Sequence, residues 1–448
     1  MNKYDIVVIG GGPAGITLAK MLGKKYKMAV IRPEDHSMIY CAMPYAIEGL
    51  LKTADTFKSD TLVTEPGAQL IRSAVSGIDF DGKTVELENN DTLQWDKLVI
   101  ATGAYPFIPP VPGSTLDGVM GFKTEKDLLV IEDLVQKGLE KAVVVGAGAI
   151  GIELAQALNF KHVHVDLVDM GESVLPNLVE PDMAVPLNQA VRDLGISLHL
   201  KSKVVEIRGD KAAQEVVLEN GDVFSLNNDG ENLKGIVVFA AGTKPEISLV
   251  KDSPLELGRD GIVVNDKMET NIPDVYAVGD VVQFTSGITG EIMPGKLATN
   301  AVPMAKVLGF NLLGKERTYP GFYNGAATKV GEHFVGGTGL SEAAAKAAGF
   351  DPVVGYSEST TKFPIMPLVK KKKFKLIADR KTHRILGAQI VSGEPVVGRV
   401  DIITFAIQQK ATVEDLSQLS YASQPHQSFY PAANLLVLAS EDIRKQLD

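Results

Sequence analysis

The sequence contains a single cysteine, Cys41, among 448 residues. One cysteine cannot form an internal disulfide, so we expect a reducing, cytoplasmic setting. Long hydrophobic runs are missing as well, because none approaches the roughly 20 apolar residues of a membrane-spanning helix. The chain begins with a short strand pattern that leads straight into a glycine turn, so no signal peptide is expected.

Positive charge is scarce too, with 45 Lys+Arg against 55 Asp+Glu and a formal net charge of −10. The chain therefore shows no electrostatic signature of a nucleic-acid or anionic-membrane partner, and we expect neither. No set of metal-ligating side chains is evident, and no metal site is predicted. The length suggests two to three domains, each with enough residues for a buried core.

Apolar strand patterns alternate with helical patterns from the start of the chain. Residues 4–10 predict a strand, 14–26 a helix and 28–31 a second strand, and the same unit recurs over residues 141–170. Alternation of this kind predicts parallel sheets, and hence an α/β protein with two Rossmann-like dinucleotide-binding domains.

The last third of the chain has a different pattern. A strand pair and an alanine-rich helix are predicted over residues 328–350, and hairpin strands over 370–393. An amphipathic helix is predicted within residues 398–416, and the helix that follows it begins at Thr412. This order predicts a separate α+β domain that starts near Tyr323.

The first chemical motif is "GGGPAG", with Gly10, Gly12 and Gly15 around Pro13 and Ala14. Glycines permit a tight turn and a close approach of the backbone to a pyrophosphate, and the helix N-terminus favours the negative charge. A glycine turn that serves packing alone is the alternative. The preceding strand and following helix favour nucleotide binding.

An acidic residue that holds a ribose is expected about 20 positions after such a turn. Ile31 and Arg32 occupy that region here, and Glu34 is the nearest carboxylate. Either Glu34 reaches back to the ribose, or the ribose is held in another way.

A second turn contains Gly146, Gly148 and Gly151, and Asp169 ends the strand that follows. A carboxylate there accepts hydrogen bonds from a ribose diol and repels a 2′-phosphate. This favours NADH over NADPH, although a simple turn residue remains the alternative for Asp169.

Two further segments are "ATG", Ala101 to Gly103, and "GD", Gly279-Asp280. In this order around two glycine turns, they resemble the FAD-dependent pyridine nucleotide–disulfide oxidoreductase family along essentially the whole chain. The resemblance implies FAD in the first domain, NAD(P)H in the second, and a homodimer joined by the C-terminal domain. The implied boundaries are residues 1–118 and 246–322 for FAD, 119–245 for NAD(P)H and 323–448 for dimerisation.

The resemblance also implies roles for single residues. Asp280 binds the flavin ribityl chain, and Glu153 faces the nicotinamide. The further residues expected to bind the cofactors are Arg32, Ser37, Ala101, Thr102, Gly103, Ile150, Gly242 and Ala298.

Cys41 lies in a Ser-x-x-x-Cys-x-x-Pro-Tyr pattern formed with Ser37, Pro44 and Tyr45. The pattern is similar to that of single-cysteine members such as coenzyme A disulfide reductase, NADH oxidase, NADH peroxidase and NADH-dependent persulfide reductase. Pro44 suits the first turn of a helix, whose N-terminus favours a thiolate. A buried, inert cysteine is the alternative.

These features predict electron transfer from NADH through FAD and Cys41 to a disulfide, persulfide or polysulfide, with coenzyme A as a candidate substrate component. An NADH oxidase or peroxidase that uses a Cys41 sulfenic acid is the first alternative. Pro13 occupies the place of a histidine that is common in those members, which disfavours the oxidase or peroxidase activity. A flavoprotein that transfers electrons to a partner protein, or senses redox state, is an alternative of another class.

The C-terminal segment contains Tyr421, His426 and Tyr430, any of which could protonate a leaving thiolate in the partner's site. A packing loop with aromatic anchors is the alternative. The lysine run from Lys370 to Lys373 could attract the phosphates of coenzyme A. We favour a solvated face on an edge strand for this run.

Overall fold

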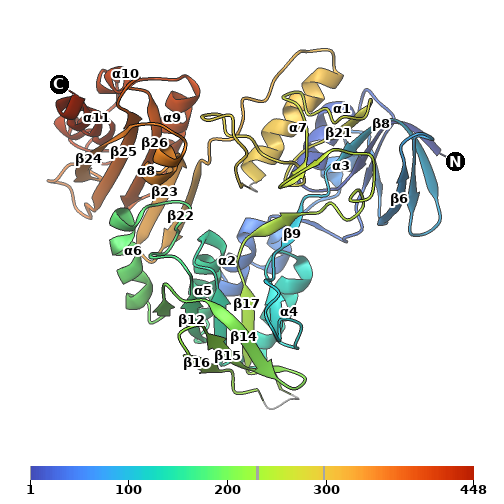
Figure 1. Ribbon diagram of the computed structural model, residues 1–448, viewed down its shortest axis with the longest axis horizontal. Coiled ribbons are helices and arrows are strands. Elements are labelled where there is room, and N and C mark those ends of the chain that lie inside the picture. Colours follow the sequence, from blue (N-terminus) through green and yellow to red (C-terminus); the bar gives the residue numbers. More distant parts are fainter. Residues whose placement is uncertain (1, 229–231, 296–297, 448) are drawn as a thin grey trace.

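The computed structural model describes residues 2–228, 232–295 and 298–447. Figure 1 shows three parts, with the N-terminal part at one end, the C-terminal part at the other and the middle of the chain between and below them. The α/β class and the separate C-terminal α+β domain are confirmed. Within the described residues, no helix is both long and apolar enough to cross a membrane.

The first sheet has seven strands in the order β5-β2-β1-β8-β7-β6, with β21 also paired to β8. β1, β2, β5, β8 and β21 are parallel. Buried apolar runs such as "IVVI" in β1 are typical of a sheet covered on both faces. The strands are β1 (Asn2–Ile9), β2 (Met28–Ile31), β5 (Gln69–Ile71), β6 (Val75–Asp79), β7 (Thr84–Leu87), β8 (Thr92–Ile100) and β21 (Val275–Ala277).

Helices α1 (Pro13–Leu22) and α7 (Ala298–Leu312) pack together on this sheet, and α3 (Thr61–Thr64) packs beside α1. The predicted strand–turn–helix–strand unit is therefore confirmed. The short pair β3 (Ser37–Met38) and β4 (Phe57–Lys58) flanks the 3₁₀ turns η1 (Tyr40–Ala42) and η2 (Thr53–Thr56) and helix α2 (Met43–Glu48).

The middle part repeats the architecture with a parallel sheet in the order β10-β17-β11-β12-β13. A small antiparallel sheet, β14-β15-β16, packs against it. The strands are β10 (Val119–Gly121), β11 (Lys141–Val145), β12 (His164–Val168), β13 (Ser197–His199), β14 (Val204–Gly209), β15 (Ala213–Leu218), β16 (Val223–Ser225) and β17 (Gly235–Phe239). The helices are α4 (Glu125–Gln136), α5 (Ala149–Phe160) and α6 (Pro181–Asp193).

Two crossings connect these parts. β9 (Ala104–Pro106) leads out of the first part and β18 (Thr243–Pro245) returns to it, and the two strands pair with each other. A further hairpin joins β19 (Leu257–Gly258) to β20 (Gly261–Ile262). The chain therefore leaves and re-enters the first part through adjacent strands.

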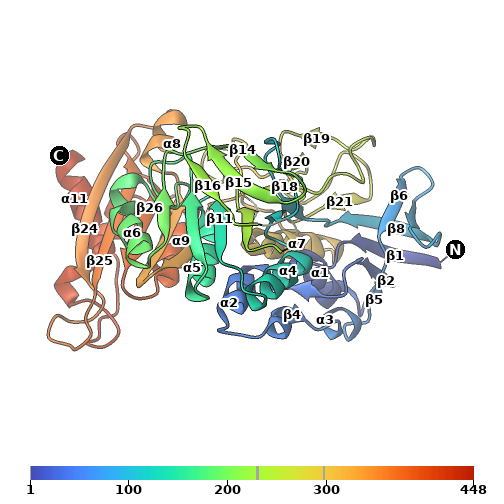
Figure 2. The same cartoon turned by 90° about the horizontal axis from the view of Figure 1, so that it is seen from below.

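The C-terminal part has an antiparallel sheet in the order β22-β23-β26-β25-β24. Its strands are β22 (Ala326–Val330), β23 (His333–Gly339), β24 (Pro352–Thr360), β25 (Lys371–Asp379) and β26 (Ile385–Ser392). Its helices are α8 (Glu342–Ala347), α9 (Val397–Gln408), α10 (Val413–Ser417) and α11 (Leu435–Leu447), with the 3₁₀ turn η3 (Pro431–Ala433). Figure 2 shows this sheet at the opposite end of the molecule from β1.

The prediction that the lysine run lies on a solvated edge strand is wrong. Lys371 to Lys373 belong to β25, which is paired on both sides because β24 forms the edge. Lys372 and Lys375 are buried in this strand. The adjacent hairpin and the helix with N-cap Thr412 follow the prediction.

Candidate functional site

A cavity of about 310 Å³ opens at the carboxyl ends of the parallel strands β1, β2 and β8. This is the position at which open α/β sheets bind ligands. Its lining brings together segments that are far apart in the sequence: the first glycine turn, Arg32, Ser37, the Ala101–Gly103 turn and Gly279-Asp280. The further lining residues include Gly11, Glu34, Tyr40, Lys123, Glu246 and Ser248.

The first glycine turn has the geometry that a dinucleotide requires. Gly10 has φ +121°, and a Cβ there would collide with the carbonyl oxygen of Ala101. A Cβ on Gly15 would collide with the carbonyl oxygen of Gly10. Gly12, by contrast, has open space beside it, at the N-terminus of α1 where Pro13 begins the helix. The turn therefore leaves free helix N–H groups beside an open cradle, which fits a pyrophosphate.

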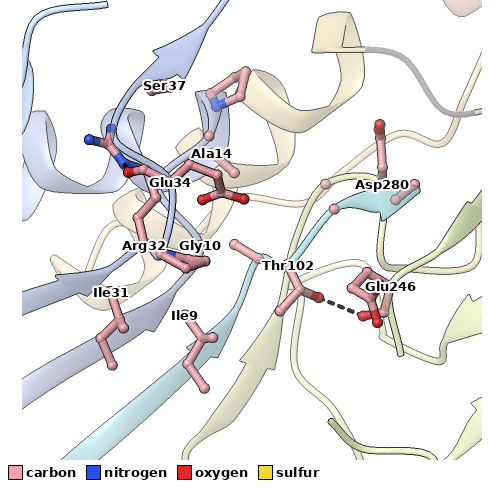
Figure 3. A pocket seen from close by; sticks show the side chains of 18 of the residues that line it. Ile9, Gly10, Ala14, Ile31, Arg32, Glu34, Ser37, Thr102, Glu246 and Asp280 are labelled. Carbon is pink, nitrogen blue, oxygen red and sulfur yellow. Dashed lines mark hydrogen bonds between the residues drawn. The ribbon is translucent and has the colours of Figure 1, made fainter. Parts of the chain in front are cut away.

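The opposite wall is formed where the two crossings meet. Thr102 Oγ1 donates a hydrogen bond of 2.7 Å to the carbonyl of Glu246, as Figure 3 shows. Gly103 has φ +77°. Asp280 follows Gly279 on this side and lies 3.6 Å from Lys123 Nζ.

Lys123 was not identified from the sequence. Burial lowers the pKa of this lysine, and Asp280 opposes the shift. Lys123 lies between β10 and α4 of the middle part, whereas Asp280 follows β21 of the first sheet, so no local pattern could reveal that they are close.

The question of the ribose carboxylate receives a geometric answer. Ile31 is buried, and the Arg32 guanidinium donates hydrogen bonds to Asp60 Oδ1 and to the carbonyls of Glu34 and Asp35. In Figure 3, this guanidinium points away from the cavity while the Glu34 carboxylate points into it. Arg32 therefore fixes the loop that carries Glu34, and Glu34 is the carboxylate that this loop presents to the cavity.

Ser37 supports the fit of a large polar cofactor. Its side chain is 3% exposed and lines the cavity, and among the described residues its Oγ has no hydrogen-bond partner. A buried hydroxyl is normally satisfied, so a ligand in this cavity would supply the missing partner. The residues present therefore fit FAD. Ala14 lies at the start of α1 in the same lining.

Cys41 is exposed in the 3₁₀ turn η1, directly before α2. Its neighbour Tyr40 lines the cavity, whereas Cys41 lies just outside that lining. Pro44 stands in the first turn of α2, as predicted. The exposed position excludes the buried, inert cysteine, and it leaves the thiol accessible to a substrate.

Tyr45 and Lys58 lie close to Cys41. Burial and the nearby Glu153 raise the pKa of Tyr45 to about 12, with Cys41 adding to the shift, so the phenol stays protonated at neutral pH. Lys58 follows Phe57 in the strand that pairs with Ser37, and it is half-buried. Burial lowers the pKa of Lys58, and Cys41 opposes the shift.

Glu153 joins three separate segments. Thr328 Oγ1 in β22 donates a 2.5 Å hydrogen bond to Glu153 Oε1, and the Tyr45 hydroxyl lies 3.5 Å from the same oxygen. Burial raises the pKa of Glu153, and these two hydrogen bonds act against the shift. Neither Tyr45 nor Thr328 was expected here, because their approach to α5 is a long-range contact.

The second glycine turn repeats the first. Gly146 has φ +113°, and a Cβ on Gly151 would collide with its carbonyl oxygen. A Cβ on Gly148 would meet only open space. Asp169 accepts hydrogen bonds of 2.6 Å from the backbone N–H groups of Ala147 and Gly171. The carboxylate thus holds the turn and remains half-exposed beside it.

Three other predicted site residues, Ile150, Gly242 and Ala298, lie outside the lining of the cavity. Ile150 is 44% exposed in the first turn of α5, near Glu153. Gly242 has φ +95° and its carbonyl accepts the N–H of Phe107, so it belongs to the crossing. Ala298 begins α7, but its side chain lies outside the described residues.

The segment that carries the C-terminal candidates leads into α11, and both views separate α11 from α2, the helix that follows Cys41. Tyr421 donates its hydroxyl to the carbonyl of Pro431, which agrees with an anchoring role. Tyr430 is 53% exposed and packs against Phe363 at 5.4 Å between ring centres. His426 is exposed.

Comparison with known proteins decides the family. The model of the pyridine nucleotide-disulphide oxidoreductase family matches residues 4–305, and its dimerisation domain matches residues 326–432. The chain belongs to this family. It is an oxidoreductase that uses FAD and NAD(P)H.

Two curated relatives and one solved structure illustrate the range of the family. The chain is 33% identical to an NADH oxidase of Methanocaldococcus jannaschii, over 98% of this chain and 99% of that protein. It is 30% identical to an NAD(P)H coenzyme A polysulfide/persulfide reductase of Pyrococcus horikoshii, over 94% and 95%. The structure of an NAD-dependent persulfide reductase from A. fulgidus aligns with a TM-score of 0.92 and 28% identity, over 100% of this chain and 83% of the other.

Proposed function

We propose that this family member reduces a disulfide, persulfide or polysulfide with NADH. The observation that carries the proposal is the position of the one thiol. Cys41 is exposed at the start of α2 and lies beside the cavity that fits FAD, with Ser37 and Tyr40 linking the two. The names of the persulfide and polysulfide reductase relatives support the choice of sulfur.

FAD would be held by the cavity lining already described. The turn at Gly10, Gly12 and Gly15 would receive the pyrophosphate, and Glu34 the ribose. Asp280 would bind the ribityl chain. The bound FAD supplies a two-electron acceptor for hydride from NADH and a donor to sulfur at Cys41. The second turn and Asp169 would bind NADH and favour it over NADPH.

Cys41 would act as the nucleophile. Its thiolate attacks one sulfur of the substrate, which forms a mixed disulfide or persulfide and expels the other sulfur as a thiolate or sulfide. Two electrons from NADH then cleave the new bond, release the second thiol and restore the Cys41 thiolate. One NADH and one proton thereby convert one disulfide into two thiols. Lys58 lies near the Cys41 sulfur.

The proton for the leaving sulfur would come from a second copy of the chain. The dimerisation domain supports a homodimer, in which the segment with Tyr421, His426 and Tyr430 approaches Cys41. Tyr430 is the strongest of the three, because it is half-exposed and its hydroxyl has no recorded partner within the described residues. We also propose a cytoplasmic location, where a lone thiol stays reduced.

The paired strands β9 and β18 support the four proposed domain segments, because the boundaries near residues 118 and 245 flank these crossings. The last boundary, near residue 322, falls just before β22.

NADH oxidase or peroxidase activity is the second candidate, because an NADH oxidase is the relative with 33% identity. In this case Cys41 would cycle through a sulfenic acid that two electrons and a proton reduce to thiolate and water. Pro13 stands where a histidine would assist that chemistry, so we place the sulfur reaction first. Electron transfer to a protein partner would require neither the Ser-x-x-x-Cys-x-x-Pro-Tyr pattern nor an exposed Cys41, so neither feature supports it.

The deciding experiment measures anaerobic NADH consumption by the FAD-loaded protein with coenzyme A disulfide, coenzyme A persulfide, polysulfide and sulfur, and separately with oxygen and peroxide. We expect Cys41→Ser to keep FAD and its reduction by NADH, while sulfur turnover falls at least about 100-fold. Equal sulfur rates in both proteins would remove Cys41 from the reaction. Oxygen or peroxide turnover far above sulfur turnover would assign the protein to the second candidate.

A further inference from the structure

The four consecutive lysines of the C-terminal domain have different environments. Lys370 pairs with Glu332 at 3.2 Å, Lys371 is exposed and Lys373 reaches a main-chain carbonyl of α6. Lys372 alone is turned into the domain core, with 4% of its surface exposed. Its role therefore differs from the solvated role of its neighbours.

The surroundings of Lys372 carry an excess of positive charge. Arg399 of α9 lies close enough for its charge to act on Lys372. Glu394 is the carboxylate that faces both, but it lies 3.6 Å from the ammonium of Lys362. Three cations thus share one carboxylate. Burial lowers the pKa of Lys372 to about 8, with Arg399 adding to the shift.

Neither cation has a polar partner within the part of the chain that the structure describes. Lys372 Nζ makes no recorded hydrogen bond or ion pair there, and the Arg399 guanidinium contacts the ring of Phe429 at 5.7 Å. Lys372 is buried and Arg399 is half-buried. A buried charge is normally paired, because an unpaired one costs several kcal/mol of solvation. An anion between these groups would remove that cost.

The groups around the pair suit an oxyanion. Ser392 lies opposite Lys372 in the sheet, and its Oγ accepts the N–H of Glu394, which leaves its O–H to donate. An ammonium, a planar guanidinium and a hydroxyl are typical donors to phosphate. We propose that Lys372 and Arg399 form a binding site for a phosphate group.

The location suggests what carries the phosphate. Phe429, which covers Arg399, belongs to the segment between Tyr421 and Tyr430 that would approach the Cys41 of a second copy. A phosphorylated thiol such as coenzyme A could place its reactive sulfur at that cysteine and a phosphate at this pair. This choice of carrier rests on the proposed function, whereas the site itself does not. Free inorganic phosphate is the other source.

The first test measures binding without turnover. The melting temperature of the FAD-loaded protein is compared in potassium phosphate and in potassium chloride of equal ionic strength, for wild type, Lys372→Met and the exposed control Lys371→Met. We expect phosphate to raise the melting temperature of wild type and the control by about 2–4 °C. Lys372→Met keeps the fold in chloride, since methionine fills the same space, but loses the increment.

The second test separates the two sources of phosphate. KM is measured for coenzyme A disulfide and for pantethine, a disulfide without phosphate. If coenzyme A is the carrier, Lys372→Met raises KM for coenzyme A disulfide about tenfold and leaves pantethine unchanged, which corresponds to one charge-assisted hydrogen bond. Unchanged values with a retained melting effect assign the site to free phosphate.

The two tests distinguish failure of the phosphate site from failure of the proposed function. A wild-type protein that phosphate stabilises no better than chloride, and a KM unaffected by Lys372→Met, would overturn the site and indicate that a carboxylate of the second copy neutralises the pair. A protein that phosphate stabilises through Lys372 but that reduces neither disulfide would contradict the proposed function alone.

Discussion

Replacing Asp169 by asparagine tests whether this carboxylate selects NADH. The side chain has a structural task as well, because its two oxygens accept the N–H groups of Ala147 and Gly171 at 2.6 Å each. An asparagine must present its amide NH₂ to one of these N–H groups. One hydrogen bond to a charged acceptor is then lost, worth about 1.5–3 kcal/mol. That loss distorts the turn for both nicotinamide cofactors alike.

The ratio of kcat/KM with NADH to kcat/KM with NADPH separates a role in cofactor selection from a role in supporting the turn. A carboxylate that also accepts from the ribose diol assists NADH alone and repels the 2′-phosphate of NADPH. We expect kcat/KM of Asp169→Asn to fall about 100-fold with NADH and about tenfold or less with NADPH. Glu172→Gln, a neighbouring exposed carboxylate paired with Lys201, should change neither value. Equal losses for both cofactors would refute the selective role.

Two further predictions follow from the same geometry. Gly12→Ala should fold normally but bind FAD at least about tenfold more weakly, because its Cβ enters only the open cradle, whereas Gly15→Ala should fail to fold the FAD domain through collision with Gly10. Circular dichroism and FAD titration distinguish them, and normal FAD binding by Gly12→Ala would contradict the cradle. Thr328→Val removes a hydrogen-bond donor to Glu153. Burial already raises the pKa of Glu153, so its contribution to stability falls as the pH rises through that pKa. Without the donor, this fall should be larger. The loss in the free energy of unfolding relative to wild type should be about 1–1.5 kcal/mol larger at pH 8 than at pH 5, because a hydrogen bond to a charged acceptor is worth about 1.5–3 kcal/mol and one to a neutral acceptor about 0.5–1.5. Equal losses at the two pH values would contradict it.

Local patterns predicted the parts of the molecule in which neighbours in sequence determine the structure. The turns at Gly10 and Gly146, the helix start at Pro44 and the cap at Thr412 all follow from backbone requirements within a few residues. The family resemblance, rather than a local pattern, assigned Asp280 to FAD, and Asp280 lines the same cavity as the first turn.

Long-range contacts account for what was missed. Lys123 of the middle part approaches Asp280, which follows β21 of the first sheet, and Arg32 holds the Glu34 loop through Asp60. The lysine run was misplaced on an edge because β24 was not anticipated. A charge run shows that residues are polar, but burial depends on which strand becomes the neighbour.

The contact around Glu153 shows why such long-range pairs matter for the reaction. Tyr45 follows Cys41 by four residues, so both lie on one side of the turn that begins α2. Its hydroxyl and that of Thr328 meet on Glu153 Oε1, at 3.5 and 2.5 Å. The thiol segment and the first strand of the dimerisation domain therefore both contact a single carboxyl oxygen on α5. A shift of any one segment must lengthen one of these contacts, so the position of Cys41 is linked to both α5 and the dimerisation domain.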